Sequence, residues 1–245
     1  MRDRHGMALA PRTAVWPPDD TEESVVGANL HQTAIRNLIS AINGAAALAT
    51  PACAPLLWQA GGQTMVAGFR HPDGSSYTTL PDVFVYPRPL DDLRRSLSVD
   101  IDGPPLLVIE VLSDTTHEND LDLQQGKGFS YCEAWVQEYL TLDPTGAYHP
   151  EQGQGWHWEG GAYRPWLREV DGRWRSRGLP LTFGLDGVRV VVFTADGRRL
   201  LREEEVERER SRLERGWAEE RARREADLAE LEQLRRRLER SDRPR

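Results

Sequence analysis

Apolar positions near the start of the chain recur at the spacing of an amphipathic helix. The apolar side chains that share this face are Val26, Leu30, Ile35, Leu38, Ile39 and Ile42. Thr21 or Ser24 can cap the start of this helix, because a short side-chain oxygen accepts a hydrogen bond from a free N–H of the first turn. Gly44 is expected to end it, since glycine is the residue most often found just past a helix.

The following hundred residues have the apolar runs and turn residues of β-strands. LLWQAG and QTMVAGF predict a hairpin around Gly61-Gly62, and PDVFVYP predicts a short strand. The run from Leu106 to Leu112 is apolar except for Glu110, which is typical of a strand covered on both faces. DLDLQQGKGFSYCEAW then indicates a helix and VQEYLTLDPTG a strand. This order predicts a right-handed crossover between two neighbouring strands.

The segment from Gly153 to Phe193 is rich in tryptophan, glycine and alternating residues, and it predicts small antiparallel strands. Its aromatic positions include Trp156, Trp158, Trp166 and Trp174. Aromatic side chains favour strands, so packing on the outer face of a twisted sheet is preferred over a role in ligand binding.

Arg and Glu dominate after Leu201, and the pattern changes to that of one long helix. In a single heptad frame the seam holds Val206, Leu213, Trp217, Leu231, Leu234 and Leu238, interrupted by Arg210, Glu220, Arg224 and Asp227. Two interpretations fit this imperfect coiled-coil stripe. One is a solvated helix with Glu–Arg pairs along its surface, and the other is dimerisation or partner docking.

The chain is thus expected to hold a flexible N-terminal arm over residues 1–20, one domain over 21–198 and a charged helix over 199–245. A length of 245 residues with 39% apolar side chains is enough for one substantial core. Two cysteines are too few for a disulfide framework. No secretory signal and no apolar membrane span are seen, so a cytoplasmic location is expected.

The net charge of −8 lies entirely in the first 201 residues, because the segment from Arg202 to Arg245 has 14 basic and 14 acidic residues. An acidic body is a poor general binder of nucleic acid, whose affinity comes mainly from Lys and Arg on phosphates. A local basic groove or a metal ion can still mediate such contact.

Asp82 and Glu110 are the first candidates for chemistry. Glu110 interrupts a buried apolar strand, which is costly unless a cation, a shared proton or a metal compensates the charge. A structural ion pair is one explanation of Glu110 alone. Asp82 leads a second apolar strand, 28 residues earlier in the chain. If these strands pair, the two carboxylates lie side by side, and such a pair suits Mg²⁺ or Mn²⁺.

Lys127 is the only lysine among 31 basic residues. Chance is one explanation of a single lysine. A functional one is that lysine provides a compact charge near a metal-bound water that attacks phosphate, and its pKa can shift where that of arginine does not. The flanking Gly126 and Gly128 are interpreted as leaving room for a large ligand.

These residues resemble a known nuclease pattern. Pro81-Asp82, Glu110 within an apolar strand and a later lysine are similar to the PD-(D/E)XK nuclease superfamily. The ordered series PDVFVYP, LLVIEVLSDTT, Asp120, Lys127 with Tyr131 four residues on, and VQEYLTLDP resembles more closely the Uma-type restriction endonuclease family. The resemblance covers about residues 20–195.

The resemblance implies an α+β, restriction-endonuclease-like fold with a mixed central β-sheet flanked by helices. It also implies metal ligation by Asp82, Glu110 and the main-chain carbonyl of Val111, with Mg or Mn as cofactor. A Glu and a His on the first helix of family members correspond here to Glu23 and His31. The superfamily usually places its lysine two residues after the Glu, where this chain has Leu112, so Lys127 fits the family's alternative position on the next helix.

Other reaction classes lack their motifs. The six histidines show no zinc spacing with cysteine, and the chain has no Walker-type loop and no G-x-S-x-G. Two functions therefore remain. The first is a Mg-dependent endonuclease with Asp82, Glu110 and Lys127 as catalytic residues and DNA as substrate. The second is a catalytically inactive nuclease-fold module that binds or assembles through its C-terminal helix, for instance as a homodimer.

Overall fold

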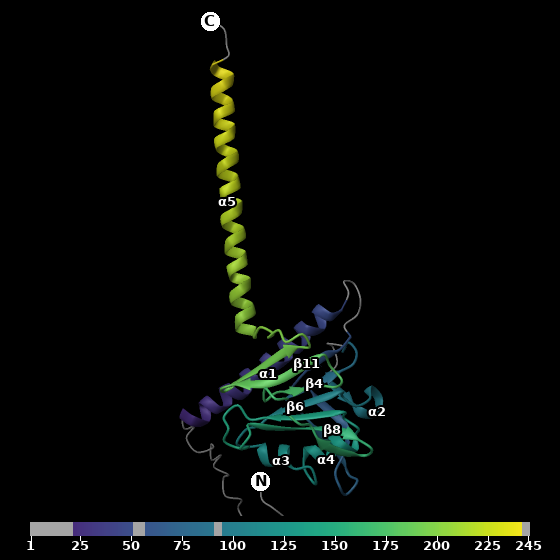
Figure 1. Ribbon diagram of the computed structural model, residues 1–245. Helices are drawn as coiled ribbons and strands as arrows, with labels where there is room; N and C mark the ends of the chain where they lie inside the picture. The colour runs from purple at the N-terminus through teal and green to yellow at the C-terminus, as the bar shows by residue number, and fades with distance from the viewer. Residues whose placement is uncertain (1–21, 51–56, 91–94, 242–245) are drawn as a thin grey trace, which may run out of the picture.

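The computed structural model describes residues 22–50, 57–90 and 95–241 of the chain and shows an α+β fold built around a six-stranded mixed sheet (Figure 1). In spatial order its strands are β1 (Gln59–Gly61), β4 (Val83–Tyr86), β6 (Leu107–Val111), β7 (Glu138–Leu142), β8 (Gly153–Glu159) and β9 (Ala162–Pro165). Only β6 and β7 run parallel, and the other neighbours are antiparallel. The expected fold class is confirmed.

Two small sheets and five helices complete the described part of the chain. One small sheet has the order β3 (Ser76–Thr79), β2 (Met65–Arg70), β5 (Ser96–Ser98), and the other has the order β10 (Trp174–Arg175), β11 (Leu181–Asp186), β12 (Arg189–Thr194). The helices are α1 (Glu22–Ala49), α2 (Val99–Asp102), α3 (His117–Leu121), α4 (Lys127–Glu133) and α5 (Glu203–Ser241).

A separate hydrophobic core lies on each face of the central sheet. One core joins α1 and the β10–β11–β12 sheet to side chains such as Val83, Ile109 and Leu140. The other joins β2, β5 and α4 to alternate side chains of the same strands, including Phe84, Val108 and Tyr139. Figure 1 shows α1 and β11 on one side of β4, β6 and β8, with α3 and α4 on the other. Every residue of β6 is buried because both faces are covered, as its apolar run predicts.

The predicted crossover is confirmed, because β6 and β7 pair in parallel with α3 and α4 between them. The prediction of small antiparallel strands over the following segment is also confirmed. Trp156, Trp166 and Trp174 are buried in the two cores. Their aromatic rings therefore contribute to packing, but inside the molecule and not on an outer face.

Two local expectations are wrong. Helix α1 does not end at Gly44 but continues to Ala49, because the alanines that follow are the strongest helix formers and open space surrounds the glycine. The hairpin around Gly61-Gly62 does not form. β1 pairs with β4, whereas β2 pairs with β3 and β5 in another sheet. Gly62 lies so close to the carbonyl oxygen of Asp82 that a side chain would clash, which explains a glycine there without a hairpin turn.

The last described helix, α5, is 39 residues long and projects away from the body (Figure 1). It is anchored at its start, where the Glu203 N–H donates to Asn37 on α1 and Glu205 pairs with Arg199 and Arg202. The long helix expected after Leu201 is confirmed. No helix among the described residues is long and apolar enough to cross a membrane. The N-terminal arm expected over residues 1–20 lies outside the described part of the chain.

A buried polar cluster joins the small β10–β11–β12 sheet to the central sheet. Glu138 on β7 accepts hydrogen bonds from the Ser176 hydroxyl and the Arg177 N–H, at 2.5 and 2.6 Å. His157 on β8 lies beside it, with Nδ1 3.4 Å from Glu138 Oε1. Burial, with a smaller contribution from Arg177, lowers the pKa of His157 to about 4, so its ring is neutral in the folded protein.

This lowered pKa predicts that the protein loses stability as the pH falls from 6.5 to 4. Over that range the unfolded chain binds a proton at His157 whereas the folded chain does not. Because the ring borders a solvent-filled pocket of about 310 Å³, we expect a loss on the order of 2 kcal/mol, less than the full shift implies. Urea unfolding of wild type and His157→Phe at both pH values measures it. Equal pH sensitivity of the two proteins would contradict the assignment.

Candidate active site

Asp82 and Glu110 lie together because β4 and β6 pair. The antiparallel register places Val83 opposite Ile109, which brings Asp82 next to Glu110. The Asp82 N–H donates to Glu110 Oε2 at 3.2 Å, and the Val111 N–H donates to Asp82 Oδ2 at 2.9 Å. Each carboxylate is thus held by the main chain of the other strand. The expected adjacency of the two carboxylates is confirmed.

Lys127 reaches the same cluster from the first residue of α4. Its Nζ lies 3.1 Å from Glu110 Oε1 and 2.8 Å from Asp120 Oδ1, and its side chain is 11% exposed. The single lysine is therefore a buried cation between two buried carboxylates. The structure brings together all three side chains that the sequence nominated for catalysis, and Val111 lies beside them.

Asp120, Tyr131 and Tyr139 form a supporting shell whose roles the sequence did not assign. The Tyr131 hydroxyl donates to Glu110 Oε1 at 2.6 Å, and the Tyr139 hydroxyl donates to the Asp120 carbonyl at 2.5 Å. Both tyrosines are fully buried and pack edge to face. The sequence held one indication that Tyr131 belongs to this shell. Residues four apart share a helix face, so Lys127 and Tyr131 are expected to point the same way.

His31 on α1 completes the cluster on its exposed side. Its Nε2 lies 3.2 Å from Asp82 Oδ2. The hydrogen bond with Asp82 raises the pKa of His31 and outweighs the opposing effect of burial, with a further contribution from the Val111 main chain. The position that the family resemblance indicated for a histidine is thus at the site, whereas the side chain of Glu23 is not among those described.

The expectation that Gly126 and Gly128 make room for a ligand is wrong. A side chain at Gly126 would lie 2.2 Å from the Asn119 carbonyl oxygen, and one at Gly128 would lie 2.5 Å from Leu123. The chain's own backbone and side chains fill the space around both glycines. They allow α3 and α4 to pack closely enough for Asp120 to meet Lys127.

The cluster contains more negative than positive groups. Burial raises the pKa of Glu110 to about 8 although Lys127 opposes the shift, and Asp120 and Asp82 add to it. Burial also raises the pKa of Asp120. Burial by itself lowers the pKa of Lys127, but the two carboxylates outweigh that effect, so the amine stays protonated. Three carboxylates thus share one lysine and one histidine, and the raised pKa values of Glu110 and Asp120 indicate that these cations do not fully compensate the carboxylates.

The family of the chain follows from comparison with known proteins. The profile of the Uma2 family, described as Putative restriction endonuclease, matches residues 20–217. The chain belongs to the Uma2 family. Membership indicates a nuclease, and it is consistent with the α+β restriction-endonuclease-like fold. Among curated proteins, no significant match to the chain was found.

The structure shows how this Uma2 protein brings a lysine to Glu110 although position 112, where the superfamily usually has its lysine, is a leucine. Leu112, two residues after Glu110, is 2% exposed. Lys127 instead extends from α4 and contacts Glu110 Oε1, whereas the Asp82 N–H donates to Oε2 of the same carboxylate.

The donor set suits Mg²⁺ or Mn²⁺, which prefer oxygen ligands, better than zinc. In residues 22–50, 57–90 and 95–241 no three His, Cys, Asp or Glu side chains converge on one point as such a metal requires. Mg²⁺ needs only one or two carboxylates, with waters and substrate phosphate oxygens at the other positions. Asp82 and Glu110 are such a pair, and carboxylates that the lysine and the histidine do not fully compensate favour a divalent cation.

The cluster is most exposed at Asp82 and His31. Glu110 and Asp120 have no exposed side-chain surface, whereas Asp82 and His31 are 16% and 18% exposed. Tyr131 is also fully buried, and Lys127 keeps a small exposed surface. The large apolar groove of the body lies elsewhere, on the α1 and β12 face.

Proposed function

We propose that this Uma2 protein is a divalent-metal-dependent endonuclease that hydrolyses DNA phosphodiester bonds. The observation that carries the proposal is the contact of Lys127 Nζ with Glu110 Oε1, in a site where Glu110 is also bound to Asp82 through the main chain. A strand-borne Asp, a strand-borne Glu and a lysine are the minimum set for metal-assisted phosphodiester hydrolysis.

In this proposal Asp82, Glu110 and the Val111 carbonyl hold Mg²⁺ or Mn²⁺. When bound, the cation would polarise a phosphoryl oxygen and lower the pKa of a water. Lys127, protonated and held by Asp120, stabilises the negative charge that develops during attack. Tyr131 holds Glu110 in place through its hydroxyl, and His31 provides a donor next to Asp82 at the solvent side.

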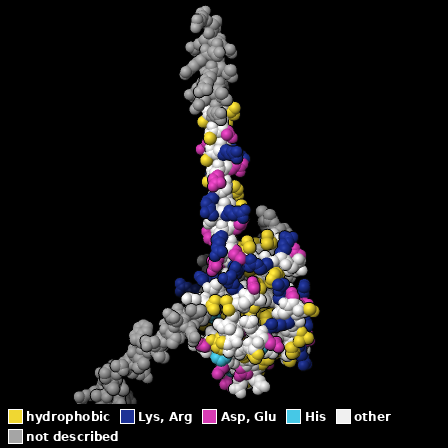
Figure 2. All heavy atoms as spheres, turned by 60° about the vertical axis from the view of Figure 1, so that its left-hand side comes forward, with side chains coloured by type: hydrophobic (Ala, Val, Ile, Leu, Met, Phe, Trp, Pro, Cys, Tyr) yellow, Lys and Arg dark blue, Asp and Glu magenta, His cyan; other side chains and the backbone are white. Residues whose placement is uncertain are grey.

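DNA must bind despite the acidic character of the body. Acidic and basic side chains intermingle on the face seen in Figure 2, and no broad basic surface stands out there. Affinity for phosphate then depends on the metal and on local arginines, so we expect binding to be weak without the cation.

Cleavage of a supercoiled plasmid with Mg²⁺ or Mn²⁺ tests the proposal. We expect nicked or linear product with wild type and none with Asp82→Ala, because the variant loses a metal ligand at the exposed side of the site. Equal melting temperatures of the two proteins show that the fold is kept. A panel of supercoiled, linear and single-stranded DNA with no cleavage above the variant would exclude the activity.

A second function has one specific observation in its favour. The apolar side chains Val206, Leu213, Trp217 and Leu231 on α5 are between 47% and 62% exposed. A nuclease fold that acts only as an assembly module through this helix accounts for that exposure. It predicts that Asp82→Ala leaves the biological role intact whereas removal of residues 202–245 abolishes it. Isothermal titration with Mn²⁺ separates the two functions, since a pure assembly module needs no cation.

A further inference from the structure

Helix α5 has almost no tertiary contact along its length. Its first turn is tied to the body by Glu203 and Glu205, and beyond this the helix extends into solvent (Figure 1). Most helical stability in proteins comes from packing an apolar face, and a helix of 39 residues with a stripe at Val206, Leu213, Trp217 and Leu231 leaves that face uncovered. This uncovered stripe is a candidate surface for association.

The charged residues on the seam show which partner fits. In the heptad frame Glu220 and Asp227 occupy one core position, whereas Arg210 and Arg224 occupy the other. In a parallel pair of two copies each residue faces the same residue of the other copy, so Glu lies against Glu and Arg against Arg. Antiparallel pairing brings the two core positions together. With the two helices fully overlapped, it places Glu220 next to the partner's Arg224, and it places Arg210 and Asp227 opposite apolar positions instead of like charges.

We infer that two copies of this chain associate through α5 as an antiparallel coiled coil. With the helices fully overlapped, Glu203 lies opposite Ser241 of the partner copy. Val206 then meets the partner's Leu238, and Leu213 meets the partner's Leu231. Glu220 meets the partner's Arg224, and the symmetry-related pair repeats this contact on the other side of the centre.

The flanking positions agree with this orientation. Glu207 and Glu209 lie near the start of α5, and Arg235 and Arg237 lie near its end. Full antiparallel overlap places these acidic and basic groups beside each other. Figure 2 shows both charge types, interrupted by hydrophobic side chains, over the coloured part of the helix. Within a single helix Arg224 pairs with its own Glu220, so the dimer gathers two such pairs into one cluster of four alternating charges.

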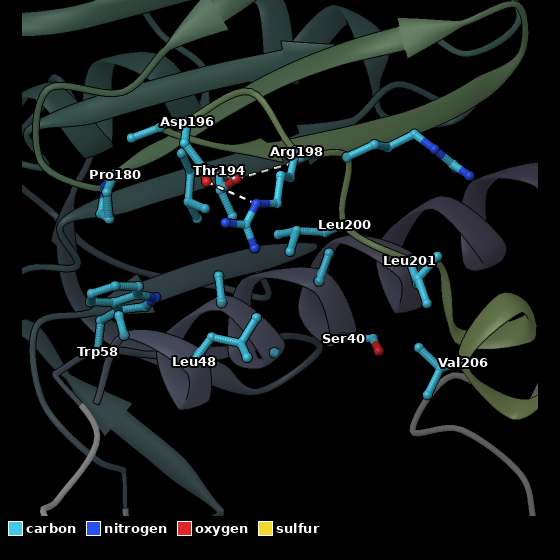
Figure 3. A pocket seen from close by; sticks show the side chains of 17 residues that line it. Ser40, Leu48, Trp58, Pro180, Thr194, Asp196, Arg198, Leu200, Leu201 and Val206 are labelled. Atoms are coloured by element: carbon cyan, nitrogen blue, oxygen red, sulfur yellow. Dashed lines mark hydrogen bonds and ion pairs between the residues drawn. The ribbon is translucent and has the colours of Figure 1, made fainter. Parts of the chain in front are cut away.

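The body continues the same apolar surface at the base of the helix. A groove of about 890 Å³ runs between α1 and β12, and Leu201 and Val206 line both this groove and the adjoining surface of α5. Figure 3 shows Leu200 and Leu201 between α1 and the start of α5, with Val206 at the open end.

This arrangement separates the two bodies. A helix of this length spans about 58 Å, so each body lies at one end of a rod formed by the two helices. Dimerisation does not depend on the proposed nuclease activity, and its test has a separate readout.

Analytical sedimentation of the full-length chain tests whether two copies associate. We expect a dimer at micromolar concentration, with Glu220→Arg weakening association at least about tenfold because it places Arg against Arg twice. The double variant Glu220→Arg with Arg224→Glu should restore wild-type affinity, since it restores opposite charges in the antiparallel dimer only. A full-length chain that stays monomeric would show that α5 serves another partner or none, and would overturn the inference.

Disulfide crosslinking measures the orientation. In full-length chain with Cys53 and Cys132 changed to serine, Leu213→Cys alone should not crosslink, because the two positions lie about 27 Å apart in the antiparallel dimer. Leu213→Cys mixed with Leu231→Cys should crosslink under mild oxidation. Crosslinking of Leu213→Cys alone would indicate a parallel dimer and contradict the inference. Circular dichroism confirms that each variant keeps its helix content.

Discussion

Replacing Glu110 with glutamine is expected to abolish metal-dependent DNA cleavage while the protein stays folded. The amide keeps the size of the side chain, and its single oxygen can still accept from the Tyr131 hydroxyl, whereas its NH2 group takes the place of the oxygen that accepts the Asp82 N–H. It cannot provide the charge that holds a divalent cation. Because loss of a group that merely orients a metal ligand costs about 10–100-fold, loss of the ligand itself should cost at least about 100-fold in cleavage rate. Plasmid cleavage at saturating Mg²⁺ and Mn²⁺ measures the effect.

Glu118→Gln is a matched control for this variant. Glu118 lies on α3 in the same part of the fold but is exposed to solvent, so the substitution removes a charge without touching the cluster. We expect wild-type cleavage from it and full loss from Glu110→Gln, with the heat of Mn²⁺ binding lost only in the latter. If Glu110→Gln cleaved at the rate of the control, Glu110 would be a structural member of the ion pair and not a metal ligand.

Replacing Lys127 with methionine is expected to impair both stability and cleavage. The variant leaves Glu110 and Asp120 buried without their cation, and removing one partner of a buried ion pair costs about 3–5 kcal/mol. The cost depends on pH. A carboxyl whose folded pKa is raised contributes its stability at low pH and loses it as the pH rises through that pKa. The variant should therefore be most destabilised above pH 8, where wild-type Glu110 also loses its proton, and urea unfolding at pH 6 and pH 9 measures this.

A double variant separates the structural from the catalytic role of Lys127. Lys127→Met with Asp120→Asn removes the cation and one of the two carboxylates, so much of the lost stability should return. Cleavage should not return, because the ammonium group that stabilises the developing charge on the attacked phosphate is absent. Lys127→Arg is a further test, since the planar guanidinium keeps the charge but not the compact shape of an ammonium group. Recovery of cleavage in the double variant would show that Lys127 has only a structural role.

The three residues of the proposed catalytic set could be selected from the sequence because each stands out in its own strand or helix. Glu110 is the single charge in an apolar run, Asp82 leads a short strand, and Lys127 is the only lysine. Burial of that run follows from its composition, and the helix after Leu201 follows from its Arg and Glu content. Both predictions needed only the order of residues within one segment of the chain.

The wrong predictions explained a glycine in the sequence by a local feature such as a turn or a helix end. Gly61-Gly62 suggests a turn, but the strand partners come from distant segments, because β1 lies on β4 and β2 lies on β5. Gly126 and Gly128 suggested room for a ligand, yet they are close-packing positions between α3 and α4. Gly44 was expected to end a helix that the alanines on either side continue.

Local sequence pattern was enough to propose the residues of the candidate site and to predict the burial of the strand around Glu110 and the heptad frame of the last helix. Only the tertiary structure decided that Asp120 shares Lys127 with Glu110, that Tyr131 anchors the same carboxylate and that His31 meets Asp82. The physical reason is that these contacts join α1, α3, α4 and two strands, and their distances depend on how the layers pack, which no local spacing encodes.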